Sequence, residues 1–358
     1  MGSRVLAAVD QHTAAAMDLV NQMERLGLGI EVVEVSGEPS TVFVEEAASL
    51  ARTRRCDLAV GIGGGSAMDT AKAVAALLSN DDLFEYLETV GKDRPLARPA
   101  ASWIAVPTTA GTGAEATSNA VLFSPEQQVK VSLRHPSMLA SLALIDPELT
   151  LPLPPGITAS SGLDALTQLI EPFVCSKPNA IIDTLCRDGI KRIGFSLPRA
   201  FHDGSDLKAR ENMMLAALFS GMALANAKLG AVHGIAGPLG GMTAVPHGVA
   251  CARLLPIVME INLDAMRSRT HDSSTLTRYQ EVAVLLSGNP NAPVDDGYAF
   301  VRRLVTGMCI PKLSRFGLTP ELFPSLIEKA KKANSMKGNP VELTNGELRR
   351  ILEMEEEY

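Results

Sequence analysis

Long hydrophobic runs, paired cysteines and an excess of positive charge are all missing from this chain of 358 residues. No stretch of about 18 apolar residues occurs, so a membrane-spanning helix is not predicted. The formal net charge is −7, which argues against a surface that binds nucleic acid, because neutralising phosphates requires clustered lysine and arginine. We therefore expect neither a membrane nor a nucleic acid among its partners.

The five cysteines are scattered, and none forms a CxxC pair or a zinc-ribbon spacing. Buried, reduced thiols are the default interpretation, which is typical of a cytoplasmic protein. No secretory signal is recognisable before Val5–Val9, which already has the pattern of a strand. Hydrophobic residues make up 46% and charged residues 20% of the chain. This composition predicts a globular protein, and the length corresponds to about two domains.

The chain up to residue 150 alternates between strand-like and helical segments. Strands are predicted at 5–9, 30–35, 58–62 and 103–106, and helices at 13–26 and 42–54. This alternation indicates a Rossmann-like parallel sheet with helices on both faces, whose ligands bind at the carboxyl ends of the strands.

Four prolines between positions 147 and 155 interrupt this pattern and predict a domain boundary. Beyond them, helices are predicted at 158–174, 180–193, 207–226 and 256–267, with few strand-like runs between. We therefore expect an α/β domain at residues 1–152 and an all-helical domain at 153–358.

A glycine-rich turn, Gly61–Asp69, follows a predicted strand and opens a helical run. Glycine lets a pyrophosphate approach the backbone, and the start of a helix supplies partial positive charge. The spacing matches neither GxGxxG nor a P-loop. Phosphate binding is the favoured interpretation, and a tight turn that only packs a strand on a helix is the alternative.

A second loop, Pro107–Thr117, follows the last predicted strand of the sheet. Its hydroxyls and glycines suit hydrogen bonds to phosphate, ribose or a carboxamide, although such loops also cap their own backbone. Two glycine loops at one edge of the sheet favour a dinucleotide over a mononucleotide.

Four polar side chains in the second half could hold a metal. Asp164 and Gln168 stand four residues apart on a predicted helix and share one face. His233 and His247 lie in an apolar, glycine-rich stretch. They could bind a divalent cation together with the carboxylate, or they could be hydrogen-bonded core residues, and spacing leaves both interpretations open.

Taken together, several ordered motifs resemble the iron-containing (group III) alcohol dehydrogenase family, which is related in fold to the dehydroquinate synthases. The likeness extends from the first strand to the C-terminus. The motifs are Gly61–Ser66 with Asp69 and Lys72, Pro107–Glu115, Asp146–Thr150, Gly162–Leu166, and the stretch from His233 to Val249. The resemblance implies a dinucleotide-binding domain at residues 1–152 and a helical metal and substrate domain at 153–358. It also implies a homodimer.

The resemblance implies that NAD(P) binds in the first domain. Asp10 would meet the adenosine ribose, which favours NAD over NADP because a carboxylate repels a 2′-phosphate, although NADP stays open. Capping of the following helix is the alternative for Asp10. The other implied cofactor-binding residues are Gly63, Gly64, Gly65, Ser66, Asp69, Thr108, Thr109, Thr112 and Lys130.

The resemblance also implies a metal, Fe²⁺ or Zn²⁺, held by one aspartate and three histidines. Asp164, His233 and His247 fill three of these positions and would be the catalytic residues. Gln168 stands where the first histidine is expected, and a neutral amide oxygen is a weaker ligand than imidazole. Gly237 stands where many family members have another histidine, which assists proton transfer.

The implied activity is the NAD(P)-dependent interconversion of a primary or secondary alcohol and its aldehyde or ketone, with the metal polarising the oxygen. The departures at Gln168 and Gly237 raise two alternatives. One is a metal-independent enzyme that resembles the maleylacetate reductases, and the other is a nucleotide-binding protein with little catalysis. Retention of Asp164, His233 and His247 together favours the metal-dependent dehydrogenase.

Overall fold

The structure is a computed structural model that describes residues 2–11, 13–269 and 273–357. The chain divides into two compact units, Met1–Pro152 and Leu153–Tyr358, and each is described by itself.

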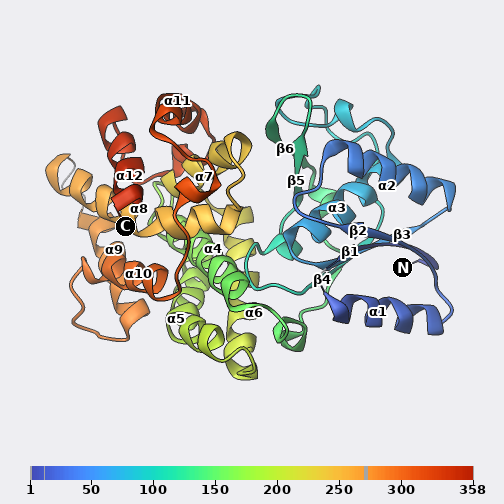
Figure 1. Ribbon diagram of the computed structural model, residues 1–358, viewed down its shortest axis with the longest axis horizontal. Coiled ribbons are helices and arrows are strands. Elements are labelled where there is room, and N and C mark those ends of the chain that lie inside the picture. Colours follow the sequence, from blue (N-terminus) through green and yellow to red (C-terminus); the bar gives the residue numbers. More distant parts are fainter. Residues whose placement is uncertain (1, 12, 270–272, 358) are drawn as a thin grey trace. The chain divides into compact units, whose positions relative to one another are not determined.

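A five-stranded parallel sheet forms the centre of the first unit, with the strand order β2-β1-β3-β4-β7 (Figure 1). The strands are β1 (Arg4–Asp10), β2 (Gly29–Val35), β3 (Leu58–Gly63), β4 (Trp103–Pro107) and β7 (Leu142–Ala143). The four predicted parallel strands are therefore confirmed, each one or two residues longer than predicted.

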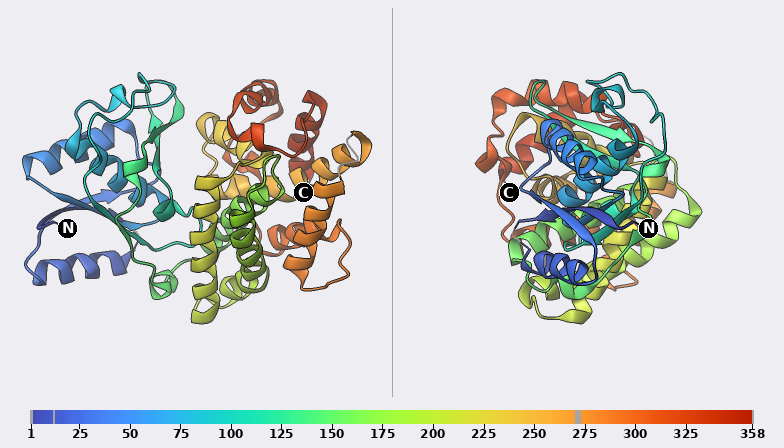
Figure 2. Two further views of the ribbon diagram at one scale, coloured as in Figure 1. Left: turned by 180° about the vertical axis from the view of Figure 1, so that it is seen from behind. Right: turned by 90° about the vertical axis from the view of Figure 1, so that its right-hand side faces the viewer.

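Helices cover both faces of this sheet, as predicted (Figure 2). They are α1 (Ala14–Arg25), α2 (Thr41–Thr53) and α3 (Gly65–Ser79). Successive residues of β1 point to opposite faces, so Val9 packs with Val20 of α1, whereas Ala8 packs with Ala71 of α3. The glycine turn runs from the end of β3 into the first turn of α3, which already begins at Gly65.

An antiparallel hairpin of β5 (Asn119–Ser124) and β6 (Val129–Arg134) was not predicted from the sequence. Its buried residues Leu122 and Val131 join the apolar cluster that includes Val44 of α2. Short 3₁₀ helices cover Leu83–Glu85, Ala114–Ala116, Pro136–Met138, Pro147–Thr150, Leu313–Phe316, Pro320–Leu322 and Ser335–Gly338.

The second unit is helical in the residues described, as predicted (Figure 1). Its α-helices are α4 (Pro155–Val174), α5 (Ala180–His202), α6 (Leu207–Asn226), α7 (Ala231–Met242), α8 (His247–Arg269), α9 (Ser273–Ser287), α10 (Asp296–Gly307), α11 (Phe323–Lys332) and α12 (Asn345–Glu357). Among the described residues no single helix is long and apolar enough to span a membrane. Helices α6 and α7, bent by 92°, pass that test only as a pair.

Two predicted helix boundaries are wrong. The helix predicted at 180–193 continues to His202. The last predicted helix, 256–267, was expected to begin at Pro256, but α8 begins at His247 and contains Pro256 in its interior. Proline removes one backbone donor from a helix, yet α8 is buried along most of its length, so tertiary packing outweighs that local cost. This earlier start places His247 on the first turn of a long helix.

Helix α4 is the centre of the second unit and packs against α5, α6 and α8. Every residue from Gly162 to Val174 is buried. A helix buried on all sides is normally apolar throughout, and α4 nevertheless carries Asp164, Gln168 and Glu171 in this segment. These three buried polar side chains need polar partners inside the unit, which makes their surroundings the candidate site.

Candidate functional site

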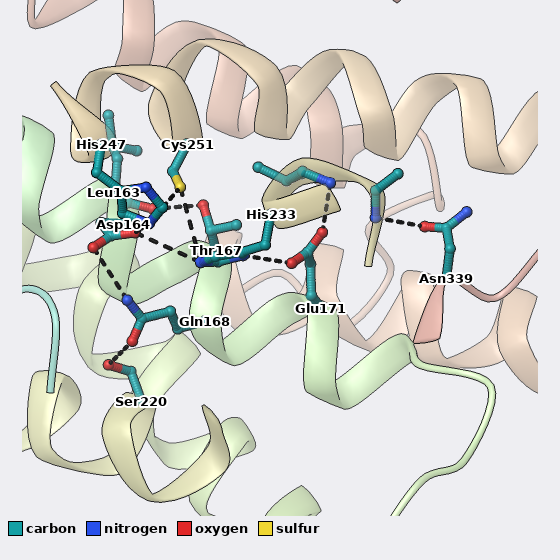
Figure 3. A network of polar contacts seen from close by, with 12 residues as sticks. Leu163, Asp164, Thr167, Gln168, Glu171, Ser220, His233, His247, Cys251 and Asn339 are labelled. Carbon is teal, nitrogen blue, oxygen red and sulfur yellow. Dashed lines mark hydrogen bonds and ion pairs between the residues drawn. The ribbon is translucent and has the colours of Figure 1, made fainter. Parts of the chain in front are cut away.

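Four side chains from α4, α7 and α8 converge in the second unit (Figure 3). They are Asp164, His233, His247 and Cys251, and their ligand atoms lie within 4.8 Å of one another. Asp164 Oδ1 is 3.9 Å from His233 Nε2 and 3.7 Å from His247 Nε2. The structure thus brings together the carboxylate and both histidines that the sequence analysis selected.

One oxygen of the carboxylate at the centre of this cluster lacks a hydrogen bond among the described residues. Asp164 is 2% exposed, and its Oδ1 atom has no hydrogen-bond partner among the described residues. A buried carboxylate oxygen in that state costs free energy unless a cation compensates it. An open oxygen close to two imidazole nitrogens is the donor set that a divalent transition metal binds, so the residues present fit such an ion.

Glu171 determines which nitrogen of His233 faces the cluster. The Nδ1 atom of His233 is 2.6 Å from Glu171 Oε2, and a carboxylate can only accept, so Nδ1 carries the proton. Nε2 is left to present its lone pair to the cluster (Figure 3). Burial lowers the pKa of His233, but the Glu171 and Asp164 carboxylates outweigh it and hold this pKa above its ordinary value.

The start of α7 is held by side chains of other elements. Val232 N–H donates to Glu171 Oε1 over 2.7 Å, and Ala231 N–H donates to Asn339 Oδ1 over 3.1 Å. These bonds satisfy two of the backbone donors that a helix start leaves without partners. Glu171 therefore positions both the helix and the imidazole that it carries.

Gln168 contacts the cluster through Asp164. Its side-chain amide donates to Asp164 Oδ2 over 3.1 Å, and its oxygen accepts from Ser220 Oγ over 3.1 Å (Figure 3). Gln168 thus lies next to the cluster, as its spacing from Asp164 predicted.

Several of the predicted cofactor residues meet at the carboxyl ends of β1, β3 and β4. Thr108 N–H donates to Gly63 O over 2.9 Å. A Cβ on Gly63 would lie 2.7 Å from Asp10 Cβ, one on Gly64 would lie 3.4 Å from Thr109 Oγ1, and one on Gly65 would lie 2.9 Å from Thr112 Cγ2. The fold therefore places Asp10, Thr109 and Thr112 next to the glycine turn.

Gly64 is the N-cap of α3, and among the described residues no side chain caps it. The first backbone N–H groups of a helix have no partner within the helix. At an uncapped start they can bind an anion, which the helix dipole also favours. The turn therefore has the chemistry of a phosphate site.

Asp69 and Lys130 have other partners in this structure. Asp69 Oδ2 accepts from Val121 N–H over 3.0 Å, its Oδ1 lies 3.4 Å from Lys72 Nζ, and Lys130 pairs with Glu38. The fully buried Lys72 also donates to Ala114 O over 2.9 Å and thereby ties α3 to the second glycine loop. Burial lowers the pKa of Lys72 despite the nearby Asp69.

Neither Cys251 nor Glu171 was predicted from the sequence to have a role in the site. Cys251 follows His247 by one helical turn, a spacing that brings side chains to one face. That signal was hidden because the helix was predicted to begin at Pro256. Glu171 follows Asp164 by about two helical turns and lies near the same helix face, but its partner His233 is far away in the sequence.

Comparison with known proteins identifies both halves of the chain. Residues 1–147 match the family described as iron-containing alcohol dehydrogenase, and residues 158–355 match its C-terminal counterpart. The chain is 36% identical to the probable alcohol dehydrogenase EutG of Salmonella typhimurium over 313 residues, which is 87% of this chain and 76% of that protein.

Solved structures give the same result. A 1,3-propanediol oxidoreductase superposes with a TM-score of 0.90 at 30% identity, covering 99% of this chain and 92% of the other. The sulfoacetaldehyde reductase of Bifidobacterium kashiwanohense, solved in complex with NAD⁺, superposes with a TM-score of 0.84 at 28% identity, covering 98% and 90%.

Proposed function

We propose that this chain, which belongs to the iron-containing alcohol dehydrogenase family, holds its divalent cation on Asp164, His233 and His247. Its similarity to alcohol and propanediol dehydrogenases makes it a metal-dependent oxidoreductase of alcohols and aldehydes. Neither a metal-free reductase nor a non-catalytic nucleotide-binding protein is favoured by these relatives.

One observation carries the proposed metal site. Asp164 Oδ1 is buried, lacks a hydrogen-bond partner among the described residues and lies within 3.9 Å of the Nε2 atoms of both histidines. When bound, a divalent cation supplies a Lewis acid for the substrate oxygen, and nicotinamide exchanges a hydride with the substrate carbon.

The residues of the chain prepare these two sites. Glu171 keeps the proton of His233 on Nδ1, so that Nε2 is available to a ligand. Gln168 donates to Asp164 Oδ2 and so directs Oδ1 toward the histidines. The uncapped start of α3 binds the pyrophosphate through its backbone N–H groups.

The identity of the dinucleotide is also a proposal, and NAD is the preferred form. Asp10 ends β1 next to Gly63, and a carboxylate at this edge accepts hydrogen bonds from a ribose 2′-hydroxyl and repels a 2′-phosphate. The relative solved with NAD⁺ is compatible with this choice. We further propose, from the family resemblance alone, that the chain forms a homodimer.

The deciding experiment combines metal analysis with activity. Protein purified without air should contain about one Fe or Zn per chain, and NAD-linked oxidation of short alcohols should be lost on chelation and return on adding metal. Asp164→Asn should lose the metal, whereas Asp264→Asn, an exposed change on α8, should keep it. Metal-free protein with chelator-resistant carbonyl reduction would contradict the proposal.

A further inference from the structure

Cys251 belongs to the same cluster as the proposed metal ligands. It is 0% exposed, and its Sγ atom lies 3.6 Å from His247 Nε2 and 3.9 Å from His233 Nε2 (Figure 3). Both contacts are made with the nitrogens that also face Asp164 Oδ1. The sulfur therefore points to the centre of the cluster rather than into an apolar part of the core.

The distances match a four-ligand site that is slightly expanded. Bonds of about 2.0 Å to nitrogen or oxygen and about 2.3 Å to sulfur place tetrahedral ligand atoms about 3.3–3.6 Å apart. Four of the six distances among these atoms lie between 3.6 and 3.9 Å, and all six lie within 4.8 Å. These four would need to shorten by only a few tenths of an ångström around an ion.

Gln168 has a different orientation. Its NH₂ group faces Asp164 Oδ2 at 3.1 Å, because a carboxylate can accept from the amide nitrogen but would repel the amide oxygen. The amide oxygen is directed to Ser220 Oγ. Gln168 is therefore arranged to hold Asp164 and not to coordinate a cation itself.

We infer that the thiolate of Cys251 is the fourth protein ligand of the cation, in place of the histidine expected at position 168. This inference rests on the proposed function, since it assumes the same metal site. On binding, the Cys251 thiol gives its proton to solvent and the sulfur donates an electron pair to the cation, so the charges of Asp164 and Cys251 together balance a divalent ion.

Two consequences follow for the metal. Within the ligand set, the Asp164 carboxylate and the Cys251 thiolate neutralise a divalent ion, and the Glu171 carboxylate behind His233 leaves the whole cluster with one negative charge. A thiolate beside two imidazoles and one carboxylate also favours Zn²⁺ over Fe²⁺.

The side chain of His247 is 34% exposed, in contrast to 8% for His233 and 3% for Asp164. A substrate oxygen would therefore add as a fifth ligand from the side of His247.

The test uses Co²⁺ as a spectroscopic substitute for the native metal in the full-length protein. The wild type should bind one Co²⁺ and show a near-ultraviolet thiolate-to-cobalt absorption band. Cys251→Ser should lose the band and bind the ion about 100-fold more weakly. Cys309→Ser, which changes an exposed cysteine, should keep both properties. Gln168→Ala should weaken binding by about tenfold, as for a residue outside the ligand set, and keep the band.

A second measurement does not depend on any variant folding. X-ray absorption on the zinc-loaded wild type should show one sulfur neighbour at about 2.3 Å, and only nitrogen and oxygen neighbours would overturn the inference. One bound Co²⁺ without the band would also overturn it, while leaving the proposed function intact. Failure of the wild type to bind Co²⁺ or Zn²⁺ at all would overturn both.

Discussion

Glu171 and His233 are joined by a buried hydrogen bond of 2.6 Å, and the other oxygen of the same carboxylate accepts from Val232 N–H. One side chain of α4 thus determines both the position of α7 and the tautomer of the imidazole. A carboxylate behind a metal-binding histidine raises its basicity and fixes its ring.

Replacing this carboxylate should weaken metal binding. For Glu171→Gln we expect a loss of about 10- to 100-fold in affinity, measured by competition with a chromogenic chelator. The pKa of His233 in metal-free protein should also fall, because burial lowers it and only the Asp164 charge is left to raise it once the Glu171 charge is gone. NMR titration of the imidazole measures this direction. Glu281→Gln, which removes a carboxylate paired with Arg187 on the surface, is the control, and unchanged affinity in Glu171→Gln would contradict the prediction.

The glycine turn contains two positions with opposite tolerance for a methyl group. A Cβ on Gly63 would lie 2.7 Å from Asp10 Cβ and 2.8 Å from Ala67 Cβ, whereas a Cβ on Gly64 would come no closer than 3.4 Å to Thr109. Gly63→Ala should lower the free energy of unfolding by about 3 kcal/mol, and Gly64→Ala by about 0.5 kcal/mol.

Urea denaturation checks these stabilities, and fluorescence titration with NADH checks the cofactor site. The Gly64→Ala methyl group would stand where we propose that a pyrophosphate approaches the backbone, so the Kd for NADH should rise by about tenfold while the fold is kept. An unchanged Kd would mean that the pyrophosphate does not contact this residue.

Position 237 has room for the acid–base group that the family resemblance leads one to expect. Among the described residues no atom lies within 4 Å of a Cβ built on Gly237, whereas one on Gly234 would lie 2.9 Å from Met336 Cε. Residue 237 follows His233 by one helical turn and shares its face. The Gly237→His variant should therefore fold. Its free energy of unfolding should be slightly lower, because the residue before Pro238 is restricted in a helix.

A histidine at this position should assist proton transfer to or from the substrate. We expect kcat for alcohol oxidation to rise by about tenfold, with a new limb in the pH–rate profile near pH 6.5, about the ordinary pKa of histidine. Steady-state kinetics across pH measures both effects. Gly234→His is the steric control and should fail to fold. A folded Gly237→His variant with the wild-type pH profile would show that proton transfer does not limit the rate.

Asp10 should determine the choice between the two dinucleotides. Asp10→Ser removes the negative charge next to Gly63, so the ratio of kcat/KM for NAD to that for NADP should fall by roughly tenfold. Asp18→Ser, on the exposed surface of α1, should leave the ratio unchanged. An unchanged ratio in Asp10→Ser would contradict this role and favour the alternative, in which Asp10 caps the following helix.

Local patterns were sufficient for the strands β1 to β4 and for the pair on α4, but not for the hairpin of β5 and β6. The apolar runs of β1, β3 and β4 follow from burial on both faces of a parallel sheet, and Asp164 and Gln168 meet because residues four apart share a helix face. Helix boundaries were less predictable. Pro256 reads locally as a helix start, yet α8 begins at His247, because packing in the core outweighs one missing donor.

The sequence by itself determined the kind of fold and the glycine turn, since alternating hydrophobicity and the conformational freedom of glycine are properties of short segments. It also selected Asp164, His233 and His247, through motifs that resemble a family. Only the tertiary structure decided that Glu171 supports His233 and that the Cys251 sulfur faces the same centre. These contacts join helices that are distant along the chain, and only the packing of α4, α7 and α8 brings their side chains within a few ångströms of one another.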